Sequence, residues 1–232
     1  MADMRALVIG NRDDADVGVL GEWADLRGLT RQGVDREDRR LPTLDGVDVI
    51  MSMGSIWRVN DPELAPMLQP EQALLREAVA ADVPVLAICF GMQQLTIAFG
   101  GEVFGTAKPE IGFRVLPSTD PAIPTGPWLQ YHYDACHLPP GATELAHNDH
   151  GLQAYRLGSA LAVQFHPEVD RSVLARWTDE SGDELAAMGL SRTLLLDEAG
   201  DHADASREAA LSLFDRFWSD RPAVQTGARD PR

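Results

Sequence analysis

The sequence predicts an α/β fold of three layers, α/β/α, in which helices cover both faces of a central, mostly parallel sheet. In the first half of the chain, short apolar runs alternate with segments of helical period, a pattern typical of βαβ units. The chain has 232 residues, 44% of them hydrophobic and 24% charged, which suits one compact domain. We expect that domain at residues 1–222 and a frayed tail at residues 223–232.

The predicted elements of the first half follow from this apolar pattern. Three short runs dominated by apolar side chains predict buried strands, at residues 6–9, 47–51 and 84–88. Three segments of helical period predict helices, at residues 17–26, 70–81 and 92–99. Pro70 is expected near the first turn of its helix, and Gly100 and Gly101 end the last of the three.

After residue 102 the pattern changes to short strand-like pieces separated by proline and glycine. They predict a small antiparallel excursion that returns to the main sheet at Leu161, with strands at residues 112–116, 153–157 and 161–165. Residues 169–221 are mostly helical by period. Within them, residues 206–218 carry one apolar face, which predicts a core or interface surface and is compatible with a homodimer.

Charge and cysteine content exclude several classes of function. The chain has 20 basic and 36 acidic residues, a formal net charge of −16, and no basic patch. We therefore expect no nucleic-acid partner and no anionic membrane surface as partner. Its two cysteines are too few for a disulfide framework or a cysteine-rich zinc site. With no signal-like or membrane-spanning apolar run, the expected location is cytoplasmic.

The first candidate for chemistry is Cys89, which lies where a predicted buried strand meets a predicted helix. A cysteine on such a turn exposes its sulfur at the carboxyl edge of the sheet, where open α/β folds place their active sites. The positive end of the helix dipole favours the thiolate there, and Gly91 gives the turn room. On this segment alone, an ordinary buried core cysteine explains Cys89 equally well.

The second candidate segment places His166 and Glu168 at the end of a later predicted strand. That strand end reaches the same edge of the sheet as Cys89. Pro167 fixes the turn, so that Glu168 can hold one imidazole nitrogen while the other faces the thiol. This is the arrangement of nucleophile, base and orienting carboxylate that defines a triad by its roles.

Together these segments resemble the class I, triad-type glutamine amidotransferase family. The quoted motifs are Ile88-Cys89-Phe90-Gly91-Met92-Gln93 and Phe165-His166-Pro167-Glu168. The resemblance extends over residues 45–170 and is closest to stand-alone members similar to the glutaminase part of GMP synthase. It implies a flavodoxin-like sheet with a nucleophile elbow, and no metal or organic cofactor.

The resemblance also implies a role for each matching residue. Cys89 would be the nucleophile, His166 the general base and acid, and Glu168 the orienting carboxylate. The oxyanion hole would be formed by the N–H groups of Gly54 and Phe90. Gln93 would help hold the substrate, as would the backbone near His132 and Tyr133.

The sequence departs from the family pattern at two places. Ala87 stands where the elbow usually opens with glycine, and Met53 replaces the first glycine of the loop after the third strand. The Ala87 methyl group is a small change. Met53 bears on the choice of substrate more than on the catalytic groups.

The fate of the ammonia and the size of the amide stay open at this point. The sequence holds no phosphate-binding Gly-Lys-Ser/Thr loop, so an ATP-dependent synthetase that accepts ammonia would be a separate protein. A γ-glutamyl peptidase could use the same triad, and a non-catalytic binding module could keep the fold. His147 and His150 suggest a polar surface loop rather than a metal site, and Cys136 lacks an elbow.

Overall fold

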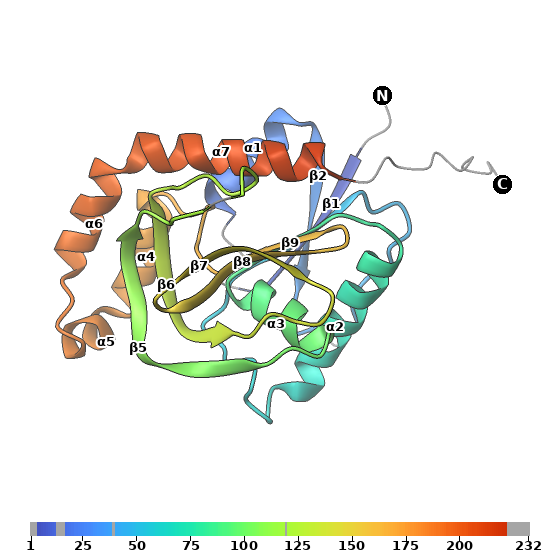
Figure 1. Cartoon of the computed structure of the whole chain (residues 1–232), viewed down its shortest axis with the longest axis horizontal. Helices are drawn as coiled ribbons and strands as arrows, with labels where there is room; N and C mark the ends of the chain where they lie inside the picture. Colours follow the sequence, from blue (N-terminus) through green and yellow to red (C-terminus); the bar gives the residue numbers. More distant parts are fainter. Residues whose placement is uncertain (1–3, 13–16, 39, 119, 222–232) are drawn as a thin grey trace.

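A seven-stranded sheet forms the centre of the molecule (Figure 1). The computed structural model describes residues 4–12, 17–38, 40–118 and 120–221; the predicted tail at 223–232 lies outside these ranges. In spatial order the strands are β2 (Leu29–Asp35), β1 (Met4–Gly10), β3 (Val49–Ser52), β4 (Val85–Ile88), β9 (Ala160–Val163), β8 (Gly151–Leu157) and β7 (Thr143–Asn148). The first five run parallel, and β8 and β7 are antiparallel additions at one edge.

Helices cover both faces of this sheet, as the sequence predicts. One face carries α1 (Gly18–Leu26) and α7 (Ala203–Ser219), and the other carries α2 (Ala65–Ala80) and α3 (Phe90–Ala98). The side chains of β1 show why both faces are covered, because they alternate along the strand. Ala6 and Val8 pack against the α1 and α7 side, whereas Leu7 and Ile9 pack against the α2 and α3 side.

A smaller lobe lies beside the main sheet. It consists of the antiparallel pair β5 (Val103–Arg114) and β6 (Trp128–Cys136) with α4 (Arg171–Glu180), α5 (Gly182–Ala187) and α6 (Arg192–Asp201), as Figure 1 shows. These elements share a separate apolar cluster that includes Ile111, Leu129, Leu174 and Leu196. The lobe therefore forms a wall beside the carboxyl edge of the parallel strands.

Several sequence predictions need correction. Pro70 lies inside α2 and not in its first turn, because the helix begins five residues earlier, with Pro66 at its start. Only residues 112–114 of the strand predicted at 112–116 are in a strand; they end the longer β5, which pairs with β6 outside the main sheet. The chain returns to the main sheet at β7, before Leu161, since β7 and β8 pair with its edge.

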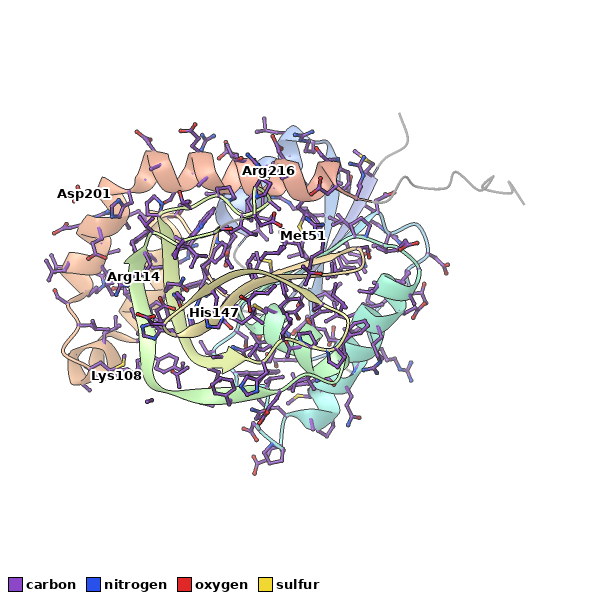
Figure 2. All side chains as sticks on the ribbon, in the orientation of Figure 1. Met51, Lys108, Arg114, His147, Asp201 and Arg216 are labelled. Atoms are coloured by element: carbon purple, nitrogen blue, oxygen red, sulfur yellow. The ribbon has the colours of Figure 1, made fainter. Side chains whose placement is uncertain are left out.

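The strands predicted to be buried contribute side chains to the interior. Met51 lies among the packed interior side chains, while the exposed Asp201 and Arg216 lie on the outer helices (Figure 2). Among the described residues, no helix combines the length and the apolar character that crossing a membrane requires.

Candidate active site

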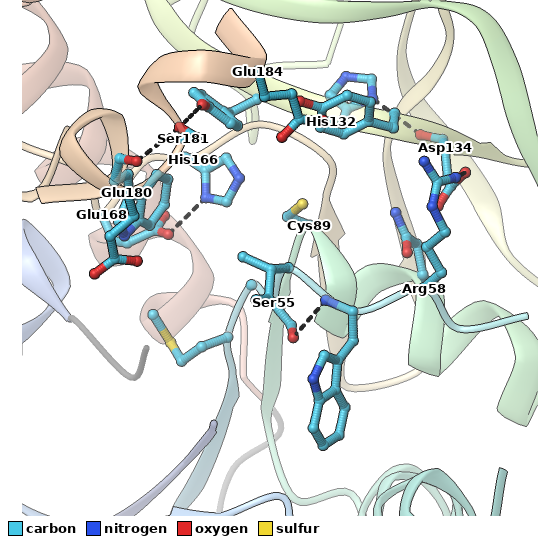
Figure 3. A pocket seen from close by; sticks show the side chains of 18 of the residues that line it. Ser55, Arg58, Cys89, His132, Asp134, His166, Glu168, Glu180, Ser181 and Glu184 are labelled. Atoms are coloured by element: carbon cyan, nitrogen blue, oxygen red, sulfur yellow. Dashed lines mark hydrogen bonds and ion pairs between the residues drawn. The ribbon is translucent and has the colours of Figure 1, made fainter. Parts of the chain in front are cut away.

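Three neighbouring parallel strands bring the predicted site residues to one edge of the sheet. Gly54 follows β3, Cys89 follows β4 and His166 follows β9, and these strands pair in that order. Their carboxyl ends open into a cavity of about 590 Å³. Figure 3 shows the Cys89 sulfur in the middle of this cavity, with the His166 ring on one side and Arg58 on the other. The cavity is also lined by Glu168.

Cys89 has the strained backbone of a nucleophile elbow. Its φ is 51° and its ψ is −105°. Residues other than glycine rarely adopt this backbone conformation, which costs about 1–3 kcal/mol. The Cys89 N–H donates to the Val163 carbonyl at 2.8 Å, which fixes the turn to the neighbouring strand. Gln164 Nε2 donates to the sulfur at 3.5 Å. The turn thus holds the sulfur at the floor of the cavity.

Glycine is required at position 91 for this turn to form. A Cβ on Gly91 would lie 2.2 Å from the carbonyl oxygen of Ser52, a backbone atom of the neighbouring strand β3. The first turn of α3 therefore packs directly against the end of β3. The methyl group of Ala87, by contrast, is accommodated in the apolar cluster on the α2 and α3 side of the sheet.

His166 and Glu168 form a buried pair. The His166 Nδ1 lies 2.8 Å from Oε1 of Glu168, whose carboxylate accepts its hydrogen bond, and both side chains are almost fully buried. The His166 ring packs against Trp177 of α4, with 4.9 Å between the ring centroids and 76° between the ring planes. The Glu168 backbone is fixed as well, because its carbonyl accepts the N–H of Val19 at the start of α1. The imidazole is thus held from two sides.

The charges around His166 decide its protonation. Burial opposes the imidazolium, yet the carboxylate of Glu168 and the thiolate of Cys89 raise the pKa of His166 well above its ordinary value. Cys89 contributes to this shift by charge and by a side-chain hydrogen bond. The raised pKa favours the imidazolium form of His166 in the folded chain.

Gly54 lies against both of these groups. A Cβ at this position would be 3.0 Å from Cε1 of His166 and 3.8 Å from Cβ of Cys89. The loop after β3 therefore passes close enough to the sulfur for a backbone amide to reach a reacting carbonyl. Met53 also lines the cavity, but its side chain is buried.

The residues expected to hold the substrate also line the cavity. Gln93 is buried in the first turns of α3, and His132 and Tyr133 lie on β6. The His132 imidazole is already engaged, with Nδ1 3.0 Å from the Asp134 carbonyl and Nε2 3.1 Å from Glu110. Burial opposes the charge of Glu110, but its bonds to His132 hold its pKa below the ordinary value. His132 is therefore a rigid part of the wall.

Sequence reasoning missed the outer wall of the cavity. Tyr131 and Ser181 join β6 to the start of α5 through a 2.7 Å hydrogen bond, and Arg58 donates to Asp134 at 3.0 Å. Acidic side chains of the lobe complete this wall: Glu180, Asp183 and Glu184. They come from a segment read only as helical, and helical period does not tell which face meets a distant strand.

Two weaker candidates lie apart from the cavity. Cys136 is buried, and burial raises the pKa of its thiol to about 12, so it is not an activated nucleophile. His147 pairs with Glu144 at 3.6 Å on half-exposed side chains of β7. Within the described residues, no group of three or more His, Cys, Asp or Glu side chains could hold a metal ion.

Comparison with known proteins identifies the family of this chain. The family model for glutamine amidotransferase class-I matches residues 49–176, which is more than half of the chain. The chain is 30% identical over 189 residues to GMP synthase [glutamine-hydrolyzing] of Aeropyrum pernix, covering 75% of this chain and 33% of that protein. It is 36% identical over 99 residues to the Helicobacter pylori P12 protein of the same name, covering 39% and 20%. The chain thus spans a third or less of these relatives.

Solved structures share the fold of this chain over almost its whole length. A glutamine amidotransferase from Thermotoga maritima superposes with a TM-score of 0.85 at 25% identity, covering 94% of this chain and 99% of that one. A glutamine amidotransferase from Methylobacillus flagellatus has a TM-score of 0.83 at 24% identity, covering 98% and 100%, which supports the fold. The match to the family model, which covers more than half of the chain, is decisive: this chain belongs to the class-I glutamine amidotransferase family.

Proposed function

We propose that the chain hydrolyses the side-chain amide of glutamine through a triad of Cys89, His166 and Glu168. The observation that carries the proposal is the 2.8 Å His166–Glu168 pair in the cavity that also holds the strained Cys89 elbow. The thiolate attacks the amide carbon, and the tetrahedral intermediate collapses as His166 gives its proton to the departing ammonia. This leaves a glutamyl thioester on Cys89.

Water then completes the reaction. His166, now neutral, takes a proton from a water molecule that attacks the thioester carbon. Collapse of the second intermediate releases glutamate and restores the thiolate beside the imidazolium. Glu168 keeps its charge throughout and holds the imidazole in one tautomer and orientation.

Two backbone amides are suited to stabilise the oxyanion. The Phe90 N–H belongs to the first turn of α3, where helix amides have no partner of their own within the helix. The Gly54 N–H belongs to the loop that passes beside Cys89 and His166. We assign both to the oxyanion hole, and we assign the α-amino and α-carboxylate groups of the substrate to the wall formed by Gln93, His132 and Tyr133.

The ammonia is delivered, in this proposal, to a separate ATP-dependent synthetase. The curated relatives carry names that join GMP synthesis to glutamine hydrolysis, and the chain matches a third or less of their length. The part of the chain that the family model matches, residues 49–176, contains the elbow and the His-Pro-Glu segment. A partner that uses the ammonia would then supply the rest of the reaction.

One observation favours a second candidate, a γ-glutamyl peptidase. The cavity of about 590 Å³ extends from Cys89 to Glu180 and Glu184 of the lobe, which leaves room for an amide larger than glutamine. The same triad would then release an amine in place of ammonia. Substrate size therefore separates the two candidates.

Steady-state kinetics on the purified chain tests the choice. The substrates are glutamine and a set of γ-glutamyl dipeptides, with ammonia and glutamate measured separately. The amidotransferase proposal predicts a higher kcat/KM for glutamine, with one ammonia released per glutamate. High activity on dipeptides with negligible ammonia release would show that the peptidase is the correct function.

A further inference from the structure

A buried arginine lies directly behind the proposed oxyanion loop. Arg36 follows β2, and its side chain has no exposed surface. Its charge is matched by Glu71 of α2, also fully buried, with 2.6 Å between Nε and Oε2. A buried ion pair is costly to desolvate and is tolerated where further hydrogen bonds satisfy its polar atoms. The remaining polar atoms of this ion pair bond mainly to the end of β3 and the loop after it.

The guanidinium donates to two consecutive carbonyls of the loop. Nη2 donates to the Met53 carbonyl at 3.0 Å, and Nη1 donates to the Gly54 carbonyl at 3.4 Å. Nη1 also donates to Asn11 Oδ1 at 2.7 Å. On the other side of the pair, Glu71 accepts from Ser52 Oγ at 2.6 Å. The ion pair is therefore bonded to the loop at three successive residues, 52, 53 and 54.

The Met53 carbonyl belongs to the same peptide unit as the Gly54 N–H. Carbonyl and N–H point in opposite directions across a trans peptide, and this bond is not among the cis bonds of the described residues. A hydrogen bond that holds the Met53 carbonyl toward Arg36 therefore holds the Gly54 N–H away from it. Rotation of that peptide would take the carbonyl away from a buried charged donor, which strongly disfavours it.

The same guanidinium also contacts the second proposed donor residue. Its central carbon lies 4.8 Å from the centre of the Phe90 ring, a cation–π contact. Phe90 carries the other N–H that we assign to the oxyanion hole. One side chain thus contacts both residues whose N–H groups we assign to that hole, Phe90 through its ring and Gly54 through its carbonyl.

We infer that Arg36, held by Glu71, is a positioning residue that keeps the Gly54 amide in its donating orientation. This inference rests on the proposed function, because it concerns the oxyanion of the same reaction. Arg36 does not line the cavity and touches no reacting atom. It acts through the Met53–Gly54 peptide, at the position where glycine is replaced by methionine in this chain.

The test compares variants that keep the core filled. Arg36→Met combined with Glu71→Gln removes both charges at similar volume, so that no unpaired charge stays buried. Arg36→Lys keeps the charge, but one ammonium cannot serve Glu71 and both carbonyls in the same geometry. The matched control is Ser52→Ala, which removes a bond to Glu71 and leaves the Arg36 bonds to the loop carbonyls in place.

Four quantities are measured on each variant: kcat for glutamine, KM for glutamine, the rate of Cys89 alkylation by iodoacetamide, and the melting temperature. Alkylation requires the thiolate but develops no oxyanion, so it reports on Cys89 without the hole. We expect kcat of the double variant to fall about 10²-fold or more, the loss typical of one oxyanion donor. We expect KM and the alkylation rate to stay within a few-fold, and Arg36→Lys to lie between the double variant and wild type.

Other outcomes separate the inference from the proposed function. A double variant that melts near the wild-type temperature and keeps its kcat would overturn the role of Arg36 alone. A parallel loss of alkylation would also overturn it, since the damage would then include Cys89. A wild-type chain that hydrolyses neither glutamine nor any γ-glutamyl amide, while Cys89 alkylates readily, would overturn the proposed function and the role of Arg36 with it.

Discussion

Gly91→Ala is expected to damage catalysis much more than its one added methyl group suggests. The new Cβ would lie 2.2 Å from the Ser52 carbonyl oxygen, while real Cβ contacts stay above 3.0 Å. Either the first turn of α3 or the end of β3 must therefore move by about 0.8 Å. Both are backbone segments of the site, because α3 carries the Phe90 amide and β3 leads into the Gly54 loop.

The size of the loss follows from that displacement. A misplacement of about 1 Å in a catalytic constellation costs about 10²-fold in rate, so we expect kcat for glutamine to fall about 10²-fold. Overpacking should also lower the free energy of unfolding by roughly 1–3 kcal/mol. Gly33→Ala is the matched control, since a Cβ there has no neighbour within 4 Å. A Gly91→Ala variant with wild-type kcat would refute the close packing of β3 and α3.

Three further outcomes follow from the site and the core. The glutamine analogue 6-diazo-5-oxo-norleucine should label Cys89 and leave Cys136 unlabelled, because burial raises the Cys136 pKa to about 12; peptide mapping checks this. Since Glu168 and Cys89 raise the pKa of His166 against the effect of burial, its proton stabilises the folded chain below pH 6.5. That contribution is lost as pH rises through the folded-state pKa of His166. Glu168→Gln should therefore flatten the pH dependence of the free energy of unfolding, measured with urea. Leu213→Ala, at a fully buried position of α7, should cost about 2–5 kcal/mol by the same assay.

The central strands could be predicted from the sequence because a strand that is buried on both faces is apolar at nearly every position. Residues 85–88 and the core of β1 are continuous apolar runs, and such runs belong to the inside of a parallel sheet. The edge strand β2 was not predicted. Its sequence, Leu-Thr-Arg-Gln-Gly-Val-Asp, is largely exposed and neither alternates nor runs apolar. Its pairing with β1 is a tertiary effect.

In the candidate site, too, some residues could be predicted from the sequence and others could not. Cys89, His166 and Glu168 were found because each sits in a short local motif, and their convergence follows from the order of parallel strands. Arg36 and Glu71 were not found. They are 35 residues apart, and a charged residue is read as exposed until a folded structure places its partner beside it.

Acid quenching of a reacting mixture shows whether a glutamyl thioester forms on Cys89. The chain is mixed with glutamine, stopped in acid within one turnover, digested and mapped by mass spectrometry. The triad mechanism predicts one glutamyl group, bound as a thioester to the peptide that contains Cys89, and one ammonia released for each group formed. It also predicts no such adduct and no turnover in Cys89→Ser. Glutamine hydrolysis at the wild-type rate by Cys89→Ser, or a glutamyl group mapped to Cys136, would contradict it.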